Sequence, residues 1–517
     1  MSRMPENLID DLPRGRADND RGRVAAARFE RPEDIAATSS LAFNAAGNPE
    51  GKLFLGVADG AVRSGPLLPD GRPQRWVTGG MPIGVADDRH ICTIAGSRAG
   101  KGRSALVPNL LTYPSTGGLL SIDPKGDNAR LTARWRAEVL GQPTGVIDPF
   151  DVSGAETQPY RTGFNPLRML TDGPRDLLVP NANLIADALV VSAESKDPHW
   201  DNCARAMIGS GLCLHVATHP NYEGRRDLVT VWELAADLMV LATGSDKLCR
   251  VEQEMIANDA AGGSVRAAAR AFYDRRGGEF SSVMSTLRKN LDWVSYDQMR
   301  AVLRDDVSVD LRDLKRRSMA LYVSLPAMRM HDLSGWFRLL VQLALAACES
   351  EPKRGHVPVL LMLDEFHVLG RMTAIETAIA QIAGFGVKLW VVLQDIGQLK
   401  QYQNYETFLG NTGVLQCFGN GDYATLEYIS KQLGQAQVLN PSVAATSYDQ
   451  AVQKGVSGQS WSLGTHPLLT PEEIGRFFGR DDRRLRQLIL RPGFRPMVLQ
   501  RAFYDRHELF RNFNRES

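Results

Sequence analysis

TIAGSRAGKGRS, residues Thr93–Ser104, is the most informative segment of this 517-residue sequence. Its first residues end a short apolar run, Ile91–Ala95, and its last residues open a segment with helical periodicity that reaches Leu111. A glycine-rich turn between a strand and a helix is the context that a phosphate-binding loop requires. In such a loop, consecutive backbone N–H groups form a positive concavity, and small side chains let phosphates approach closely. We therefore expect the turn to bind phosphate groups, with Lys101 adding a compact positive charge.

The segment departs from the usual phosphate-loop pattern at two positions. Ala95 stands where the first glycine is usual, and Gly102 stands where a serine or threonine usually helps to hold Mg²⁺. A plain surface turn would also explain the Gly-Lys-Gly triplet, but the flanking strand and helix favour the phosphate loop. The residues predicted to contact a nucleotide are Gly96, Ser97, Arg98, Ala99, Gly100, Lys101, Gly102 and Arg103.

Two acids follow another apolar run, Val357–Leu363. A buried strand that ends in acids places them at the C-terminal edge of a sheet, where open α/β folds bind their ligands. Asp364 is the candidate to hold Mg²⁺ through water, and Glu365 the candidate to orient or deprotonate an attacking water. Acids at a strand end also cap helices. The combination with the Lys101 loop favours the nucleotide interpretation.

A third strand-like run, Lys388–Leu393, ends in Gln394, which could contact the γ-phosphate and sense its loss. An ordinary strand end would explain the same residue. Two weaker candidates remain. The segment Asp123–Asp127 could be a loop near the nucleotide or a plain turn, and His215 and His219 have helical i,i+4 spacing without a third metal ligand. We interpret these two histidines as a structural pair.

The composition is that of a globular protein: 43% hydrophobic, 23% charged, with a formal net charge of +1. It argues against a disordered chain, a histone-like polycation and a coiled coil. No run approaches the 18 or so apolar residues of a membrane-spanning helix, and the N-terminus lacks the apolar core of a signal peptide. The six cysteines are scattered, which suggests neither a disulfide framework nor a zinc site and favours a reducing cytoplasm.

Strand-like runs alternate with helical segments over most of the chain, which predicts an α/β fold with a parallel-rich sheet. The alternation stops between Leu177 and Val302, where apolar residues recur at three- and four-residue steps. We therefore predict an inserted all-α domain at 177–302, flanked by a nucleotide-binding domain at 36–176 and 303–517. Residues 1–35 have few large apolar residues and predict a flexible arm.

As an ordered set, the motifs resemble those of the type IV coupling proteins, the hexameric ATPases of conjugation and type IV secretion. The resemblance covers about Gly51 to Tyr504 and includes that family's own Gly-Lys-Gly loop. The motifs that carry it are His90–Gly102, Pro108–Leu111, Asp123–Asp127, Asp148–Phe150, Phe164–Leu167, Trp200–Arg205, Asp364–Phe366 with Leu369–Arg371, Gln394–Asp395, Gln398–Leu399 and Leu468–Glu473.

The resemblance implies a RecA-like P-loop domain with an inserted all-α domain, ATP and Mg²⁺ as ligands, and a homo-oligomeric ring that is a hexamer when active. It implies delivery of a relaxase–DNA complex or of effector proteins to a type IV secretion channel. The chain resembles a soluble branch of the family, expected in the cytoplasm and recruited to the inner membrane by a partner. The channel components at that membrane are among its expected partners.

Related ring motors carry an arginine in the helix after the acidic pair, but Ala374–Gly384 contains none, and Arg371 is the nearest. Two other functions stay open: a double-stranded DNA pump of the chromosome-translocase kind, and a substrate receptor whose nucleotide site only controls assembly. The helical insert speaks against the pump.

Overall fold

The structure is a computed structural model. It describes residues 27–69, 71–190, 199–241, 250–274, 278–304, 308–352, 355–370, 375, 381–400, 402, 405–443 and 459–513. The chain divides into two compact units, which we call the terminal unit (residues 1–114 and 390–517) and the central unit (115–389).

The terminal unit contains a mixed sheet built on a parallel centre. Strand β5 pairs in parallel with β10 on one side and with β11 on the other. Four more strands extend the sheet beyond β11, and all of their pairings are antiparallel. In sheet order the strands are β4 (Met81–Val85), β1 (Leu53–Ala58), β15 (Met497–Gln500), β14 (Arg486–Leu490), β11 (Thr412–Phe418), β5 (His90–Ala95) and β10 (Val387–Leu393).

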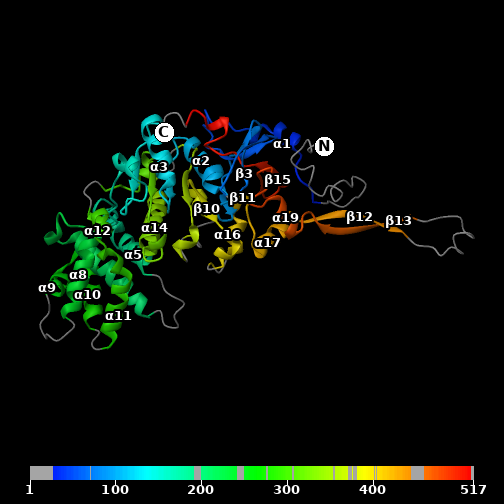
Figure 1. The fold of residues 1–517 in the computed structure, drawn as a ribbon. Coiled ribbons are helices and arrows are strands. Elements are labelled where there is room, and N and C mark those ends of the chain that lie inside the picture. The colour runs from blue at the N-terminus through cyan, green and yellow to red at the C-terminus, as the bar shows by residue number, and fades with distance from the viewer. Residues whose placement is uncertain are drawn as a thin grey trace, which may run out of the picture. The chain divides into compact units, whose positions relative to one another are not determined.

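Burial explains why these segments are strands. Every residue of β5, β10 and β11 is buried, the pattern of strands covered on both faces. Two antiparallel ribbons accompany the sheet: β2 (Ala61–Leu67) with β3 (Pro73–Thr78), and β12 (Gln435–Val443) with β13 (Gln459–Pro467). The ribbon β12–β13, in orange, projects from the unit as two long arrows (Figure 1).

In the described part of the central unit, four strands pair with one another in parallel. Their order is β9 (Val359–Leu363), β6 (Leu119–Ile122), β8 (Ala320–Val323) and β7 (Thr144–Ile147). Among the helices of the unit are α3 (Asp127–Arg134), which contacts β7 and β8, and the long α14 (Ser334–Ser350). Ten residues of α14 are buried, so this helix contributes a large part of the unit's core.

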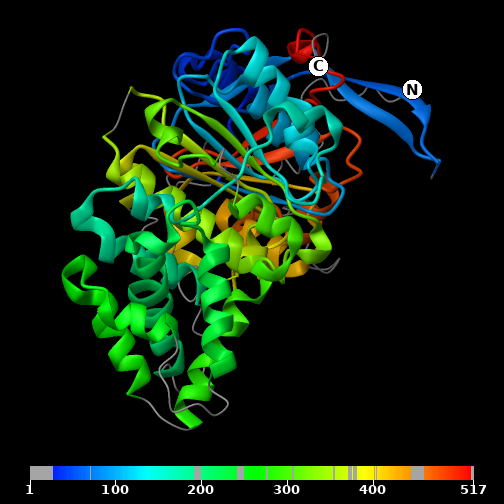
Figure 2. The ribbon, with the colours of Figure 1, turned by 90° about the vertical axis from the view of Figure 1, so that its left-hand side faces the viewer.

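Helices alone occupy the described part of residues 177–302. Figure 2 shows most of them, in green, gathered into a bundle apart from the strands of the central unit. The principal ones are α5 (Leu178–Leu189), α6 (His199–Ala206), α7 (Leu214–Thr218), α8 (Leu228–Leu241), α9 (Arg250–Ala257), α10 (Ala260–Tyr273), α11 (Gly278–Leu291) and α12 (Asp297–Arg304). The domain boundaries drawn from the sequence stay a prediction.

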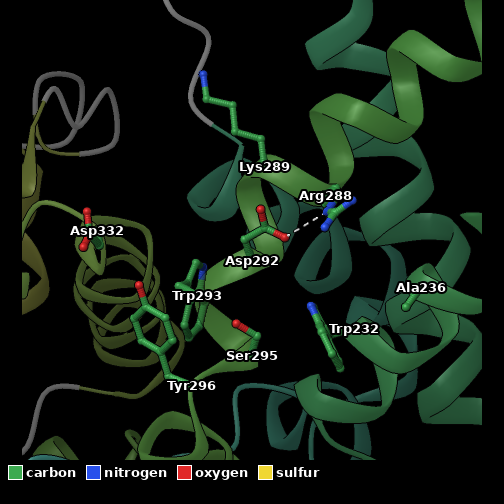
Figure 3. A pocket seen from close by; sticks show the side chains of 9 residues that line it. All are labelled: Trp232, Ala236, Arg288, Lys289, Asp292, Trp293, Ser295, Tyr296 and Asp332. Carbon is green, nitrogen blue, oxygen red and sulfur yellow. Dashed lines mark ion pairs between the residues drawn. The ribbon is translucent and has the colours of Figure 1, made fainter.

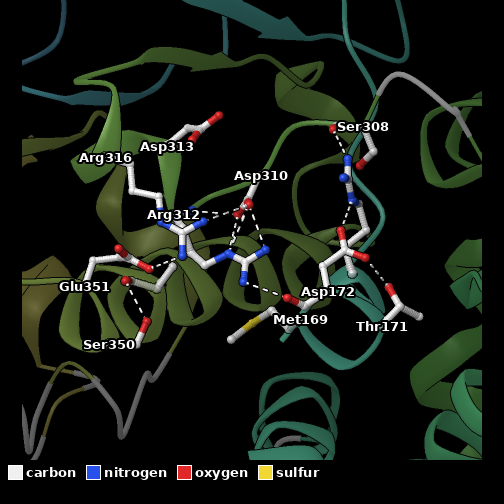
Figure 4. A network of polar contacts seen from close by, with 12 residues as sticks. Met169, Thr171, Asp172, Ser308, Asp310, Arg312, Asp313, Arg316, Ser350 and Glu351 are labelled. Carbon is white, nitrogen blue, oxygen red and sulfur yellow. Dashed lines mark hydrogen bonds and ion pairs between the residues drawn. The ribbon is translucent and has the colours of Figure 1, made fainter. Parts of the chain in front are cut away.

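A network of arginines and acids connects residues 308–316, which follow the helices, with Asp172 and with the end of α14 (Figure 4). Asp310 pairs with Arg312 at 2.8 Å, and the Arg312 guanidinium also donates to the carbonyl oxygen of Asp172 at 3.0 Å. Arg316 pairs with Glu351 at 2.5 Å, next to the end of α14. Burial raises the pKa of Asp310, but hydrogen bonds from Arg312 outweigh it and hold that pKa below its usual value. Asp310 is therefore charged at neutral pH.

Two sequence expectations differ from the structure or fall outside it. The arm predicted to reach residue 35 is packed at its described end, because Pro32–Ala37 forms helix α1 and Ile35 is buried. Residues 1–26 and Arg371 lie outside the part of the chain that the structure describes, as does most of Ala374–Gly384. Within the described ranges, no helix has the length and apolar character needed to cross a membrane.

His215 and His219 lie in and directly after α7, with ring centroids 4.9 Å apart. His215 is buried, and its Nδ1 accepts a hydrogen bond from the Asn258 amide at 3.1 Å. The side-chain oxygen of Asn258 accepts a hydrogen bond from the Ala260 N–H, and this bond fixes the orientation of the Asn258 amide. His215 must therefore be neutral. The described residues contain no cluster of three or more His, Cys, Asp or Glu side chains that could hold a metal.

This neutral histidine predicts a pH dependence of stability. Burial, with His219 adding to it, lowers the pKa of His215 to about 4. Below the unfolded pKa of about 6.5 the unfolded chain binds the extra proton, so the free energy of unfolding falls as the pH drops towards about 4, by at most about 3 kcal/mol. We expect His215→Gln to flatten this slope in urea unfolding between about pH 7 and pH 4. An unchanged slope in the variant would contradict the assignment.

Candidate functional site

The predicted phosphate loop, Gly96–Gly100, leaves the end of β5 inside the terminal unit. Arg98 and Gly100 both have positive φ, 57° and 88°, and the Ala99 N–H donates to the Gly96 carbonyl oxygen at 3.1 Å. The loop is thus a tight turn. Helical backbone starts at Lys101 and continues through Gly102–Leu106 into α2 (Val107–Thr112). This geometry directs the first N–H groups of the helix toward the loop, as phosphate binding requires.

A close approach to the end of β11 explains the small residues of the loop. The Gly96 N–H donates to the Phe418 carbonyl oxygen at 3.2 Å. A Cβ on Gly96 would lie 2.0 Å from the Gly419 carbonyl oxygen, and a Cβ on Gly419 would lie 2.3 Å from the Ala99 Cβ. Gly419 also has φ +69°, which favours glycine. The loop and the strand end therefore fit only because neither glycine has a side chain.

A buried arginine from the C-terminal segment holds the other side of the loop. Arg501 follows β15, is 1% exposed and donates to the Ala99 carbonyl oxygen at 2.8 Å. Burial lowers the pKa of Arg501 to about 10, and Asp482 and Asp481 act in the opposite direction, so the side chain stays charged at neutral pH. Sequence reasoning missed this residue, because an arginine after a strand in an arginine-rich segment gives no separate signal.

Gln394, the predicted γ-phosphate sensor, contacts the loop. The Ser97 hydroxyl donates to the Gln394 side-chain oxygen at 2.9 Å. Two further bonds fix the Gln394 backbone: its N–H donates to the Gln398 side-chain oxygen at 2.9 Å, and its carbonyl oxygen accepts from the Asn420 amide at 3.3 Å. The structure thus brings together two predicted site residues that lie 297 positions apart in the chain.

The predicted acids lie in the central unit, directly after β9. Glu365 has the left-handed φ of 61°, a conformation that is strained for a residue with a side chain and is often found at functional sites. Its carboxylate lies 3.5 Å from the His367 ring nitrogen. Asp364 precedes it, at the position where the chain leaves the sheet.

Asp123 lies at the same sheet edge as Asp364. Strands β6 and β9 are parallel neighbours with Ile122 opposite Leu363, so the two acids follow paired residues. Asp123 is 2% exposed and accepts the Ala129 N–H at 2.9 Å. Burial, together with the negative charges of Asp364 and Asp127, raises the pKa of Asp123 to about 7, although the hydrogen bond from Ala129 acts in the opposite direction. From the sequence alone, the segment that contains Asp123 is only a weak candidate for a loop near the nucleotide.

These two carboxylates suit a magnesium ion that a nucleotide also binds. Mg²⁺ prefers oxygen ligands and is usually held by one or two carboxylates, with substrate phosphates and waters completing an octahedron. Among the described residues, no three or more acids, histidines or cysteines form a cluster that could bind a metal by protein ligands alone. The carboxylates of Asp123 and Asp364 therefore fit a Mg²⁺ ion whose other ligands are phosphate oxygens and waters.

A second concave site lies among the helices of the central unit (Figure 3). It is a cavity of about 750 Å³ whose walls combine aromatic rings with exposed basic side chains. The Arg300 guanidinium stacks on Trp232, 4.5 Å from the centroid of its ring. Arg288 forms an ion pair with Asp292 at 3.5 Å. The lining residues are Trp232, Ala236, Arg288, Lys289, Asp292, Trp293, Ser295, Tyr296 and Asp332.

Comparison with known families decides the membership of the chain. The model of the family described as "Type IV secretory system Conjugative DNA transfer" matches residues 59–516. The chain belongs to this family. The coupling-protein resemblance, expected from the ordered motifs, is thereby confirmed.

Two curated relatives illustrate the family. The conjugal transfer protein TraG of Escherichia coli is 27% identical over 409 residues, which are 75% of this chain and 62% of TraG. The VirD4 protein of Rhizobium radiobacter is 28% identical over 438 residues, which are 83% of this chain and 59% of VirD4. The chain thus spans about three fifths of the length of either relative.

A solved structure confirms the fold class. The plasmid coupling protein TrwB, in complex with ADP and Mg²⁺, superposes with a TM-score of 0.56 at 14% identity, covering 83% of this chain and 90% of TrwB. The RecA-like α/β fold predicted from the sequence is therefore correct.

The contact between loop and strand end predicts different effects for Gly96 in the loop and Gly102 in the helix that follows it. Gly96→Ala forces a Cβ against a backbone oxygen, so we expect a loss of about 1–3 kcal/mol in the free energy of unfolding. Gly102→Ala is the matched control, because nothing lies within 4 Å of its Cβ and alanine favours a helix. Urea unfolding measures both. Equal losses would contradict the close approach.

Proposed function

We propose that this protein is an ATP-hydrolysing coupling protein, which recruits a relaxase–DNA complex or effector proteins and delivers them to a type IV secretion channel. Membership of the conjugative DNA transfer family supports the proposal that the protein acts in a type IV secretion system. The single observation that carries the enzymatic part is the strand–loop–helix at Gly96–Lys101, in contact with Gln394. TrwB, a fold neighbour, binds ADP and Mg²⁺, which fits the same ligands here.

Each candidate residue has a distinct task in this proposal. The backbone N–H groups of Gly96–Arg103 and the Lys101 ammonium bind the phosphates, as in other glycine-rich loops. Asp364 holds Mg²⁺ through water, and Glu365 orients or deprotonates the attacking water. Bound Mg²⁺ would neutralise phosphate charge. We add Asp123 to this set, because it follows the strand next to the one that ends before Asp364.

Gln394 links the nucleotide to the rest of the terminal unit. Its side chain holds Ser97 in the loop, while its backbone is fixed by Gln398 and Asn420. A γ-phosphate that competes for the Ser97 hydroxyl or the Gln394 amide would change these bonds when it leaves. We propose that this exchange converts hydrolysis into a shift of neighbouring loops, which in a homo-oligomeric ring would move the cargo.

The proposal predicts Mg²⁺-dependent ATP hydrolysis that DNA stimulates. Lys101→Ala should lower the rate about 100-fold or more, because it removes a charge from the developing transition state. Lys431→Ala is the matched control, since Lys431 is exposed on helix α17 (Tyr423–Leu433) and pairs only with Glu427 among the described residues. Phosphate release, measured with and without DNA, checks this.

A further variant separates binding from chemistry. Glu365→Gln should keep ATP affinity within about threefold and lose hydrolysis, because it removes the base but no phosphate ligand. Wild-type protein that assembles and binds DNA yet hydrolyses no ATP would overturn the enzymatic proposal.

The cavity of Figure 3 favours one second candidate, a substrate receptor whose nucleotide site only controls assembly. Its aromatic rings and exposed Arg288 and Lys289 offer both apolar and charged contacts to a protein cargo.

For the receptor, we expect full-length Lys101→Ala protein to retain the relaxase of its own transfer system in a pull-down. The double variant Arg288→Ala/Lys289→Ala should lose at least about tenfold in affinity for that relaxase, the scale of one or two interface contacts. Retention by both variants at wild-type affinity would exclude this cavity as the receptor site.

A further inference from the structure

A cavity of about 710 Å³ lies in the terminal unit and opens beside the phosphate loop. Loop residues Arg98–Gly100 and the Arg103 side chain form one wall. The segment after β15 and strand β3 form the others, with Phe503 and Trp76 among the lining residues. No residue that the nucleotide site assigns to magnesium or to the attacking water lines it.

The walls of this cavity are strongly basic. Eight arginines line it against two aspartates. Asp481 pairs with Arg72 and Arg480, and Asp482 with the buried Arg486 outside the cavity. In the described part of the chain, Arg75, Arg98 and Arg483 have no ion pair. An anionic ligand would therefore gain attraction that the protein itself does not satisfy.

The cavity also offers flat surfaces. The Arg103 guanidinium lies 4.4 Å from the centroid of the Phe503 ring, and that of Arg506 lies 5.5 Å from the Trp76 ring. Arginine planes and aromatic rings both stack on nucleic-acid bases. A ligand that combines phosphate with a planar ring fits this lining better than a simple anion does.

The direction in which the chain runs through the phosphate loop indicates on which side the nucleoside of a bound nucleotide would lie. In a phosphate loop the lysine reaches the β- and γ-phosphates, and the backbone beyond it cradles the α- and β-phosphates. Gln394 contacts Ser97, at the γ-phosphate side in the proposed roles, whereas Arg103 stands two residues after Lys101. The α-phosphate, and the ribose attached to it, would therefore emerge on the Arg103 side. That side is a wall of the cavity.

We infer that this cavity is the subsite for the nucleoside of the bound nucleotide. The base stacks among Trp76, Arg506 and the Arg103–Phe503 pair, and the unpaired arginines attract the α-phosphate and ribose oxygens. The inference rests on the proposed nucleotide function and adds the residues that would hold the base.

The test compares ATP with inorganic tripolyphosphate, which has the phosphates but no nucleoside. Binding to the full-length protein is measured by calorimetry with Mg²⁺ for the wild type, Trp76→Ala and Arg506→Ala. We expect each variant to weaken ATP about tenfold, the scale of one lost stacking contact, and to leave tripolyphosphate within about twofold. Lys101→Ala should weaken both ligands.

Arg476→Ala is the matched control. Arg476 is exposed and stacks on the Phe477 ring at 4.6 Å, but it does not line the cavity. This control should change the affinity for neither ligand. Melting temperatures within a few degrees of the wild type show that the variants fold.

Photo-crosslinking gives a readout that does not depend on substitution. Bound 8-azido-ATP should label the peptide with Trp76 or the peptide with Phe503–Arg506. Labelling elsewhere, unchanged ATP affinity in both variants, or equal losses for ATP and tripolyphosphate would each overturn the nucleoside subsite. Wild-type protein that binds neither ligand would instead refute the nucleotide function itself, and the subsite with it.

Discussion

The close contact between the loop after β5 and the end of β11 is the constraint on which the candidate site depends. Gly96 and Gly419 meet there without side chains, and a Cβ on either would collide with the other segment. Arg501 secures the loop from the C-terminal segment by a hydrogen bond to Ala99 across 402 positions of the chain. The turn is therefore shaped by two distant segments, the end of β11 and the C-terminal segment, as well as by its own sequence. Such preorganisation keeps N–H groups directed at a ligand before it binds.

The parallel pairing of β6 and β9 is the second organising feature. With Ile122 opposite Leu363, Asp123 and Asp364 emerge together at one edge, where their mutual repulsion and burial raise the pKa of Asp123. A fold tolerates such a costly arrangement of carboxylates most readily where it serves a ligand. A divalent cation with its phosphates would relieve the repulsion, which is consistent with the role proposed for these acids.

The arginines of the C-terminal segment serve two different purposes, although they look alike in the sequence. Arg486 and Arg501 are buried and hold the fold through Asp482 and backbone carbonyl groups. Arg483 and Arg506 are exposed and line the cavity beside the loop. Burial, which depends on the whole fold, separates the two groups. One arginine-rich run thus contributes both to loop stability and to the proposed nucleoside subsite.

The sequence by itself predicted the α/β class, the strands that end in Ala95, Leu363 and Leu393, and the family, because apolar runs and loop motifs are local patterns. Only the tertiary structure revealed the contacts of Gly419 and Arg501 with the loop and the position of Asp123 beside Asp364. These neighbours come from segments that lie hundreds of residues apart in the chain. It also added the antiparallel strands β14 and β15, whose short runs among arginines gave no clear period. Local periodicity encodes which segments form strands, whereas register and burial follow from packing that no single segment contains.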